Sequence, residues 1–287
     1  MDLSVVIVTW NSAGHIASCL DALAGELPPS SEVVVVDNAS DDRSASIARD
    51  HGTRVIENPR NTGFGAACNL GATEASGSVL LFLNPDAVVE PGAVKALRRA
   101  LVAAPRVGAA GGALVNPDGT PQAAADDFIS AATLVKRAAQ TALGDASRKR
   151  ALAPAGEVDW VYGAFLVVRR DAWEEVGGFD DRYHMYYEDM DLCWRLRERG
   201  WQVRFAPDAR AMHVGGASAA HRWDGFPGEE KARSLMRFQQ THTSSAAVVG
   251  FRVAAALAYG GFAAARAVTG KDAKPYWQMA RVFAAGR

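Results

Sequence analysis

Short β-branched runs alternate with segments of helical spacing over the first hundred residues, and this alternation limits the folds open to the chain. The runs are Leu3–Thr9, Glu32–Asp37, Arg54–Glu57 and Val79–Leu83. Between them, apolar residues recur every three or four positions, as at Ile16, Leu20 and Leu23. Strands that alternate with helices form βαβ units. The alternation therefore predicts an α/β fold with a mostly parallel, twisted sheet flanked by helices.

Polar residues follow three of these strands. They are Thr9 to Asn11, Asp37 with Asn38, and Asn84 to Asp86. Ligands of such sheets bind beyond the carboxyl ends of the strands, so we expect one cleft to receive all three groups. Helix caps and turns use the same residue types, so each group taken alone has an equally good structural explanation.

The pattern loosens after Gly112. The later elements are expected as a helix and a mobile loop beside the cleft in residues 123–155, a strand in residues 157–168, a helix from about Asp189 to Arg199, a strand over residues 202–205, and helices from Glu229 onward. We divide the chain into an α/β domain of residues 1–227 and a helical extension of residues 228–287.

The charge of the chain is unevenly distributed. The whole chain carries a net charge of −1, which predicts no general attraction to nucleic acid. From Gly228 to the end, however, basic residues exceed acidic ones by six. A basic extension indicates an anionic partner, such as a membrane surface.

Several features predict a cytoplasmic protein. The chain opens with Asp2 and a strand instead of a basic signal-peptide region. The three cysteines, Cys19, Cys68 and Cys193, are far apart and lie in apolar helical patterns, which is typical of buried free thiols in a reducing compartment. The uncharged run of residues 253–265 is shorter than the roughly 20 residues that span a bilayer.

The extension has two interpretations. Arg252 and Arg266 lie fourteen positions apart, so a helix places them on nearly the same side. Its other faces carry Val253, Leu257, Tyr259, Phe262 and Val268. Such a helix is expected to lie in a membrane interface with its arginines toward the headgroups, at the inner face of the plasma membrane. The alternative is that it packs on the α/β domain or forms a homodimer contact.

Two common nucleotide-binding loops are missing from the sequence. A dinucleotide enzyme carries Gly-x-Gly-x-x-Gly after the first strand, where this chain has Thr9-Trp10-Asn11-Ser12-Ala13-Gly14. The nearest string, at residues 63–68, lacks the third glycine, and there is no Walker loop.

Two short segments contain candidate metal ligands. Pro85 ends a strand and leaves Asp86 at its rim, where a carboxylate suits a hard divalent cation that in turn binds a diphosphate. One carboxylate is a poor metal site, so a second ligand is needed. His213, before a pair of glycines, is a candidate, although a single histidine is more often structural.

Residues 184–191 form the densest group of chemically active side chains. Asp189 precedes Leu192 by three positions and Leu196 by seven, so it shares their inward face. The positive end of the helix is expected to keep Asp189 ionised, and an inward carboxylate kept ionised can act as a general base. The alternative is that Glu188 or Asp189 only caps the helix.

Taken in order, these segments resemble the family-2 glycosyltransferases of the GT-A fold, particularly the bacterial rhamnosyltransferase-like and galactofuranosyltransferase-like members. The matching strings run from residue 3 to residue 218. They are Val5-Val6-Ile7-Val8-Thr9-Trp10-Asn11, Val36-Asp37-Asn38-Ala39-Ser40-Asp41-Asp42, Asn58-x-x-Asn61-x-Gly63-Phe64-Gly65-x-x-x-Asn69-x-Gly71, Leu83-Asn84-Pro85-Asp86, Gly177-Gly178-Phe179-Asp180, Tyr187-Glu188-Asp189-x-Asp191-Leu192-x-x-Arg195 and His213-x-x-Gly216-x-Ser218. The family often has Asp-x-Asp where this chain has Asn84-Pro85-Asp86, so only the last carboxylate is kept.

The resemblance implies a role for each matching residue. Thr9, Asn11 and Asp37 would bind the base and ribose of a UDP- or dTDP-sugar, and Asn61, Gly65 and Asn69 would line the donor pocket. Asp86 and His213 would hold Mg²⁺ or Mn²⁺ against the diphosphate, Asp189 would be the catalytic base, and Glu188 would contact the acceptor.

The implied reaction is a single inverting displacement by an acceptor hydroxyl, in cell-envelope glycan or glycolipid synthesis. The sugar would be rhamnose or a related one, and the acceptor a glycan, a lipid-linked sugar or a small molecule. One alternative is a sugar-nucleotide nucleotidyltransferase, but residues 9–14 contain no Lys or Arg to bind a triphosphate. The other is an inactive sugar-nucleotide-binding module, which predicts the loss of Asp86, Asp189 or His213, and all three are present.

Overall fold

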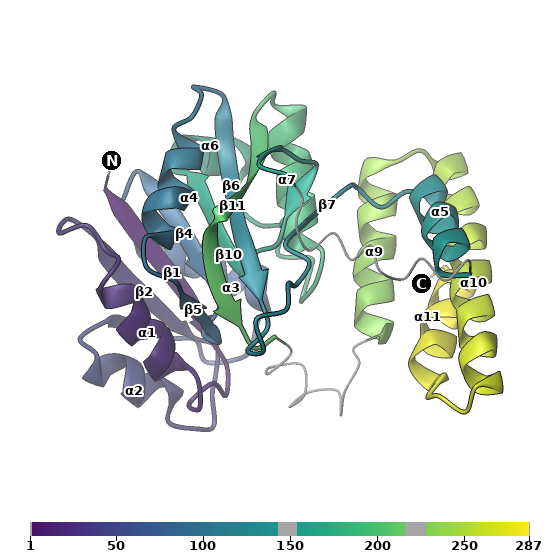
Figure 1. Cartoon of the computed structure of the whole chain (residues 1–287), viewed down its shortest axis with the longest axis horizontal. Helices are drawn as coiled ribbons and strands as arrows, with labels where there is room; N and C mark the ends of the chain where they lie inside the picture. Colours follow the sequence, from purple (N-terminus) through teal and green to yellow (C-terminus); the bar gives the residue numbers. More distant parts are fainter. Residues whose placement is uncertain (1, 143–153, 216–227, 287) are drawn as a thin grey trace.

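One nine-stranded sheet forms the centre of the protein, with helices on both of its faces and a separate group of helices at one side (Figure 1). The computed structural model describes residues 2–142, 154–215 and 228–286. The strand order is β3-β2-β1-β4-β10-β6-β11-β5, and β8 pairs with β11 beside this path.

The first half of the sheet is parallel, as the sequence predicted. Its strands are β1 (Leu3–Thr9), β2 (Glu32–Asp37), β3 (Arg54–Glu57) and β4 (Val79–Leu83), with the predicted bounds. Every residue of β1 and β4 is buried, because β1 lies inside the sheet and helices cover it. Thr9 pairs with Asp37 in the β1–β2 register, so the polar ends of these two strands lie side by side.

The second half makes the sheet mixed. Strand β10 (Phe165–Arg169) runs antiparallel to β4 and to β6 (Val107–Val115). Strand β11 (Gln202–His213) is parallel to β6 and antiparallel to β5 (Ala87–Val89). Neighbouring parallel strands need a crossover connection, whereas antiparallel strands do not. The βαβ spacing of the sequence therefore does not indicate the position of the antiparallel strand β10 in the sheet.

Two strand predictions in this half were wrong in extent. We expected a strand over residues 202–205, but β11 continues to His213 through a register shift between Ala206 and Arg210. Pro207 and Asp208 lie in this bulge. The single strand expected in residues 157–168 is three short ones: β8 (Gly156–Glu157), β9 (Trp160–Val161) and β10.

Helices of the α/β domain pack on the sheet or on one another. They are α1 (Ile16–Ala24), α2 (Ser44–Asp50), α3 (Phe64–Glu74), α4 (Ala93–Leu101), α6 (Arg170–Val176) and α7 (Glu188–Glu198). Helix α7 lies within one residue of its predicted bounds. All three cysteines are buried and free, as expected.

Four helices form a unit beside the sheet (Figure 1). They are α5 (Ala131–Ala142), α9 (Gly228–His242), α10 (Ser245–Val268) and α11 (Lys274–Ala285). Before α5 in the chain, β7 (Ala125–Asp126) pairs with β9 in a separate two-stranded ribbon. The helix expected in residues 123–155 is thus confirmed as α5, but it packs on α10. The loop expected after it, the residues Gly216 and Ser218 of the last matching string, and the end of the α/β domain at residue 227 all lie outside the described residues.

Helix α9 joins this unit to the α/β domain through α7. The Trp194 and Phe238 rings meet edge to face, with centroids 5.5 Å apart. His242 Nε2 lies 2.6 Å from Oδ1 of Asp191, which is fully buried. Ser234 Oγ donates to the carbonyl oxygen of Met185 at 2.8 Å, just before α7. The extension therefore supports the segment that begins α7.

The outward face of α10 is apolar, but its arginines do not point where we expected. Arg252 donates to the carbonyls of Phe283 and Ala284, and Arg266 donates to the carbonyl of Asp272. Both side chains therefore connect α10 to α11 and its preceding turn. The expectation that they face headgroups was wrong, because the uncapped carbonyls of α11 lie within their reach.

Candidate active site

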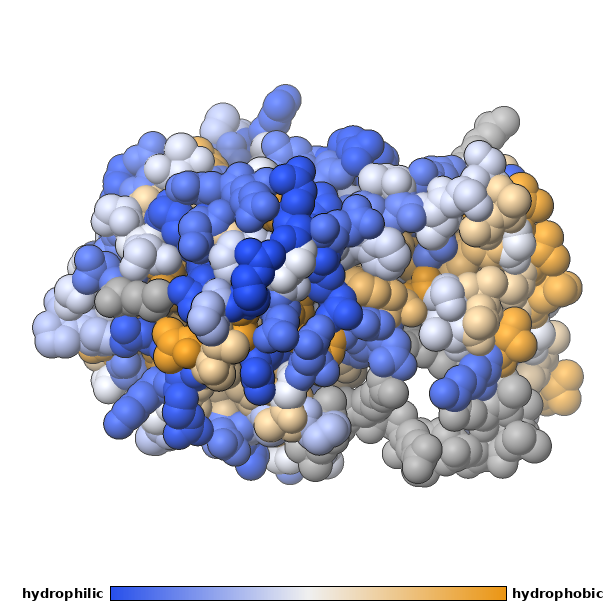
Figure 2. Space-filling model, turned by 90° about the horizontal axis from the view of Figure 1, so that it is seen from above, coloured by the Kyte–Doolittle hydropathy of each residue, from blue (hydrophilic) through white to orange (hydrophobic). Residues whose placement is uncertain are grey.

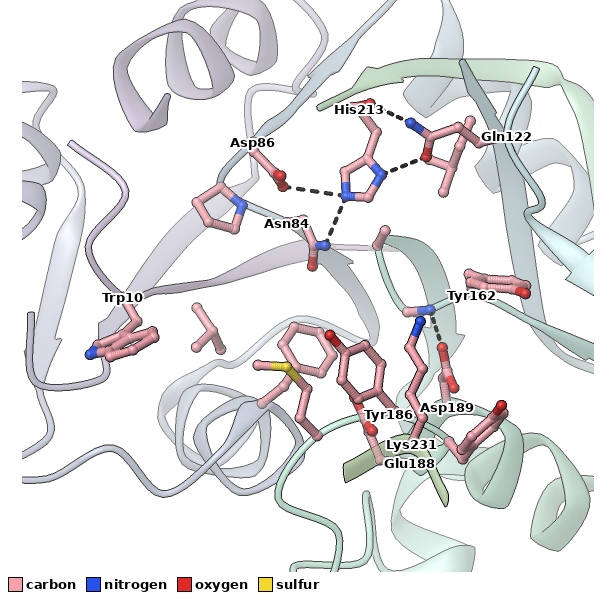
Figure 3. Close-up of a pocket in the computed structure, with 18 of the residues that line it drawn as sticks. Trp10, Asn84, Asp86, Gln122, Tyr162, Tyr186, Glu188, Asp189, His213 and Lys231 are labelled. Atoms are coloured by element: carbon pink, nitrogen blue, oxygen red, sulfur yellow. Dashed lines mark hydrogen bonds and ion pairs between the residues drawn. The ribbon is translucent and has the colours of Figure 1, made fainter. Parts of the chain in front are cut away.

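A pocket of about 380 Å³ opens at the carboxyl ends of the central strands (Figure 3). Each of the three polar segments that were expected to meet contributes to its wall: Trp10 after β1, Asn38 after β2, and Asn84 to Asp86 after β4. Most of the remaining wall is formed by residues 160–164, residues 185–189 and His213. The prediction of one common cleft is confirmed.

Asp86 and His213 lie together on one side of this pocket. Ala87 pairs with His213 in the β5–β11 register, which brings the two side chains together. Asp86 Oδ1 is 3.3 Å from His213 Nε2, and the N–H of Gly215 donates to Asp86 Oδ2 at 3.0 Å. Burial acts to raise the pKa of Asp86, but the hydrogen bond and charge of His213 and the backbone donors lower it below its ordinary value. Asp86 is therefore a carboxylate at neutral pH.

Gln122 orients the His213 ring, and nothing in the sequence indicated this role. Its Nε2 donates to Asn116 Oδ1 and to the carbonyl of His213, so its Oε1 faces His213 Nδ1 at 2.9 Å. An acceptor at Nδ1 holds a proton there, so a neutral His213 would present the lone pair of Nε2 to a metal ion. Asn84 Nδ2 lies 3.1 Å from the same Nε2.

This pair can supply two ligands of a metal site. Neighbouring ligands of an octahedral ion, each about 2.1 Å from it, are about 3 Å apart. The 3.3 Å between Asp86 Oδ1 and His213 Nε2 is close to that spacing. Within the described residues, no group of three or more His, Cys, Asp or Glu side chains is arranged to hold a metal. A divalent cation here would therefore take its other ligands from a diphosphate and water.

Asp189 and Glu188 lie on the opposite side (Figure 3). Tyr186 and Tyr187 have φ angles of 69° and 66°, which is an uncommon conformation for residues other than glycine. This conformation turns the chain into α7. The N–H of Gly163 donates to Asp189 Oδ2 at 2.8 Å, and the N–H of Met190 donates to Oδ1. Asp189 is thus held in the pocket wall by the break between β9 and β10.

The pKa values of this pair are shifted by burial, in the direction opposite to the one that the helix terminus favours. We expected the helix terminus to favour ionised Asp189, but burial outweighs its backbone hydrogen bonds and raises its pKa to about 6. Burial, and next the charge of Asp189, raise the pKa of Glu188 well above its ordinary range. Glu188 Oε2 is buried with no hydrogen-bond partner in the described part of the chain. At neutral pH, Asp189 is therefore ionised, while burial makes Glu188 hold its proton more strongly than a free Glu does.

Thr9 and Asp37 each have a buried side-chain oxygen, and neither residue is in the wall of the pocket. Thr9 Oγ1 and Asp37 Oδ1 have no hydrogen-bond partner among the residues with described positions. Asp37 Oδ2 accepts from the N–H of Ser40 at 3.1 Å, which orients the carboxylate. Buried polar atoms are seldom unpaired in native proteins, so a ligand is a natural partner for both. Asn11 lines a second hollow instead, and its Oδ1 accepts from the N–H of Asp41.

Of the three residues expected to line the donor pocket, only Asn61 is in its wall. A Cβ atom on Gly65 would lie 3.0 Å from Phe179 Cβ, so this glycine allows α3 to pack closely. Asn69 Nδ2 donates to the carbonyl of Phe179, and the N–H of Phe179 donates back to Asn69 Oδ1. The structure thus corrects the expected positions of Gly65 and Asn69: both support the chain behind the pocket.

Lys231, from the first turn of α9, also lines the pocket. It is partly buried, its Nζ lies 4.7 Å from the centroid of the Tyr186 ring, and burial lowers its pKa. It is the only Lys or Arg among the described residues of the pocket wall. Sequence reasoning missed it, because Lys231 is 42 positions from Asp189 and belongs to no motif.

A mixed α/β sheet with an Asp–His pair facing a buried acidic residue defines a glycosyltransferase of the GT-A fold. The chain belongs to glycosyl transferase family 2, whose family model matches residues 4–177. A curated relative, the N-acetylglucosaminyl-diphospho-decaprenol L-rhamnosyltransferase of Mycobacterium tuberculosis, is 34% identical over 238 residues, which cover 74% of this chain and 75% of the relative.

Solved structures share the fold at low sequence identity. The mannosyltransferase PcManGT of Pyrobaculum calidifontis, in complex with GDP-Man and Mn²⁺, has a TM-score of 0.61 at 18% identity and covers 99% of this chain and 85% of its own. The glucosyl-3-phosphoglycerate synthase of Mycobacterium tuberculosis, with Mn²⁺, UDP and glucosyl-3-phosphoglycerate, has a TM-score of 0.56 at 17% identity and covers 83% and 79%.

Proposed function

We propose that this glycosyltransferase transfers rhamnose or a related sugar, with inversion, from a UDP- or dTDP-sugar to a hydroxyl of a lipid-linked glycan acceptor in cell-envelope synthesis. The observation that carries the proposal is the Asp86–His213 pair facing Asp189 across one pocket. The sugar and the acceptor class rest on the 34% identical rhamnosyltransferase, whose name includes a diphospho-decaprenol acceptor.

The donor is expected to lie along the ends of β1, β2 and β4. The unpaired oxygens of Thr9 and Asp37 suit the base and ribose, with Asn11 and Asn61 at the edge of the same region. Asp86 and His213 would hold Mg²⁺ or Mn²⁺, which when bound neutralises charge on the diphosphate leaving group.

Asp189 is the proposed general base. Its pKa of about 6 leaves it ionised at neutral pH yet basic enough to accept the acceptor's proton as the C–O bond forms. The N–H of Gly163 orients the carboxylate, and Glu188, beside it in the pocket wall, is placed to contact the acceptor. One base is sufficient for a single displacement with inversion.

We further propose that the helical unit lies on an anionic membrane surface. Helix α10 has the length and composition of a spanning helix, with a mean hydropathy of 1.5, and only 17% of its apolar stretch is buried. Val253 and Leu257 are 56% and 71% exposed, and apolar side chains gather over this unit in Figure 2. Because Arg252 and Arg266 bind α11, we favour a helix that lies in the interface over one that spans it.

Charge on α11 supports the same orientation. The ring of Trp277 is 3.8 Å from where a Cβ on Gly260 would lie, so it borders the apolar face of α10. Lys274 and Arg281 are exposed three positions before and four after it. An interfacial tryptophan flanked by cations suits an anionic lipid surface.

The transfer itself can be tested with purified enzyme. A panel of UDP- and dTDP-sugars, including dTDP-rhamnose, is incubated with Mn²⁺ and N-acetylglucosaminyl diphosphate on a decyl chain, and products are read by mass spectrometry and anomeric NMR. We expect one donor to give an inverted glycoside. A retained anomeric configuration contradicts the proposed mechanism, and the absence of transfer from every donor contradicts the proposed substrates.

A further inference from the structure

The helical extension contributes a cation to the acceptor side of the pocket. Lys231 is the fourth residue of α9, and Figure 3 shows it with Tyr186, Glu188 and Asp189, across the pocket from Asp86 and His213. Its Nζ lies over the Tyr186 ring, at 4.7 Å from the centroid. The contact of Ser234 with Met185 anchors α9 beside this segment, so Lys231 is held in place.

Given the proposed function, we propose that Lys231 and Tyr186 form a subsite that binds a phosphoryl group attached to the acceptor. Around Lys231 the wall carries two carboxyl groups, Glu188 and Asp189, and burial favours the neutral form of Glu188, which reduces the repulsion of an incoming anion. A partly dehydrated ammonium binds a phosphoryl oxygen strongly, as a charge-assisted hydrogen bond.

The position of Lys231 argues for the acceptor instead of the donor diphosphate. The donor's charge is expected at Asp86 and His213, on the other side of the pocket. Lys231 instead stands beside the proposed base, next to which the acceptor hydroxyl must lie. Moreover, α9 is followed after two residues by α10, so one helical unit supplies both the phosphate subsite and the apolar surface.

Three variants of α9 provide a matched comparison. Lys231→Met removes the ammonium and keeps the apolar stem, and Lys231→Arg keeps the charge. Arg233→Met removes a cation two positions away whose side chain is exposed and paired with Glu229, so it controls for the charge of the helix.

The binding test does not depend on the sugar. Decyl diphosphate is titrated calorimetrically into enzyme saturated with Mn²⁺ and either UDP or dTDP. We expect Lys231→Met to weaken the binding of decyl diphosphate at least about tenfold. The affinities of Lys231→Arg and Arg233→Met for decyl diphosphate should stay within about threefold of that of the unaltered protein. The nucleotide affinities of all four proteins should agree. If decyl diphosphate binds equally to the Lys231→Met variant and the unaltered protein, or does not bind at all, the subsite is refuted. If Lys231→Met weakens the nucleotide instead, Lys231 serves the donor and the proposal is wrong.

The kinetic test separates this inference from the proposed function. With decyl-diphospho-N-acetylglucosamine, Lys231→Met should raise KM with little change in kcat, whereas with decyl N-acetylglucosaminide, which lacks phosphate, it should change neither. Equal losses on both acceptors contradict a phosphate subsite. If the unaltered protein transfers no sugar, the proposed substrates are refuted, and the calorimetric titration alone tests the subsite.

Discussion

Replacing Asp189 by Asn should slow the enzyme and, at neutral pH, stabilise its fold. Burial raises the pKa of Asp189 from 3.8 to about 6, so ionising it in the folded protein costs about 3 kcal/mol relative to the unfolded chain. Asn removes that cost. It also presents one oxygen to two donors, the N–H groups of Gly163 and Met190, and the lost hydrogen bond costs about 1 kcal/mol. We therefore expect a net gain of about 1–2 kcal/mol in the free energy of unfolding at pH 8.

The sign of the pH dependence follows from the direction of the shift. The folded protein binds a proton at Asp189 up to about pH 6, while the unfolded chain releases it near 3.8. Stability from this group is therefore fully present below pH 3.8 and is lost as the pH rises toward and through 6. The advantage of the Asn variant should appear across this window and level off above it.

Catalysis should show the same ionisation. The kcat/KM of the unaltered enzyme should rise about tenfold per pH unit below pH 6 and level off above it, because Asp189 must be ionised to accept a proton. Asp189→Asn should lower kcat by about 10² or more while nucleotide binding persists.

Urea unfolding at pH 4 and pH 8, together with initial rates over the same range, measures both effects. Glu198→Gln, an exposed change on the same helix, is the control. Near-normal turnover of the Asn variant would show that Asp189 is not the base. Equal stability of the two proteins at pH 8 would refute the claim that burying this charge destabilises the fold.

Three further changes test the metal site and the membrane surface. Asp86→Ala and His213→Ala should each weaken Mn²⁺-dependent binding of UDP or dTDP by at least about tenfold, and full activity in excess EDTA would rule out the metal. Gln122→Leu leaves both proposed ligands but removes the acceptor at His213 Nδ1, so calorimetry should show Mn²⁺ affinity about tenfold lower, whereas unchanged affinity would mean that His213 needs no orienting partner. Val253→Asp with Leu257→Asp should abolish sedimentation with anionic vesicles without lowering turnover on a short-chain acceptor. If these changes instead convert a dimer to a monomer in sedimentation velocity, the apolar face is a subunit contact.

Local sequence determined the parallel half of the sheet and helix α7. The strand ends at Thr9, Asp37 and Leu83 were predicted to the residue, because β-branched runs and the polar residues that stop them are neighbours in the chain. The rule that ligands bind beyond these strand ends then predicted the pocket. The resemblance to a known family assigned roles to residues of this region, and these roles stay predictions. Asp86, Asp189 and His213 lie in the pocket wall, whereas Thr9 and Asp37 are buried at the strand ends outside it.

Tertiary structure alone decided which residues surround those side chains. Gln122 contacts His213, 91 positions away in the sequence. Lys231 reaches the pocket from α9, and the spacing of residues in α9 indicates its apolar face but not the pocket that it borders. Asn69 matched a donor-pocket motif but holds the backbone of Phe179, 110 positions away. The pKa of Asp189 likewise depends on how far distant elements exclude water, and burial raises it where the helix terminus alone would lower it. Local spacing records how a segment folds, whereas desolvation and long-range hydrogen bonds exist only after the segments have packed together.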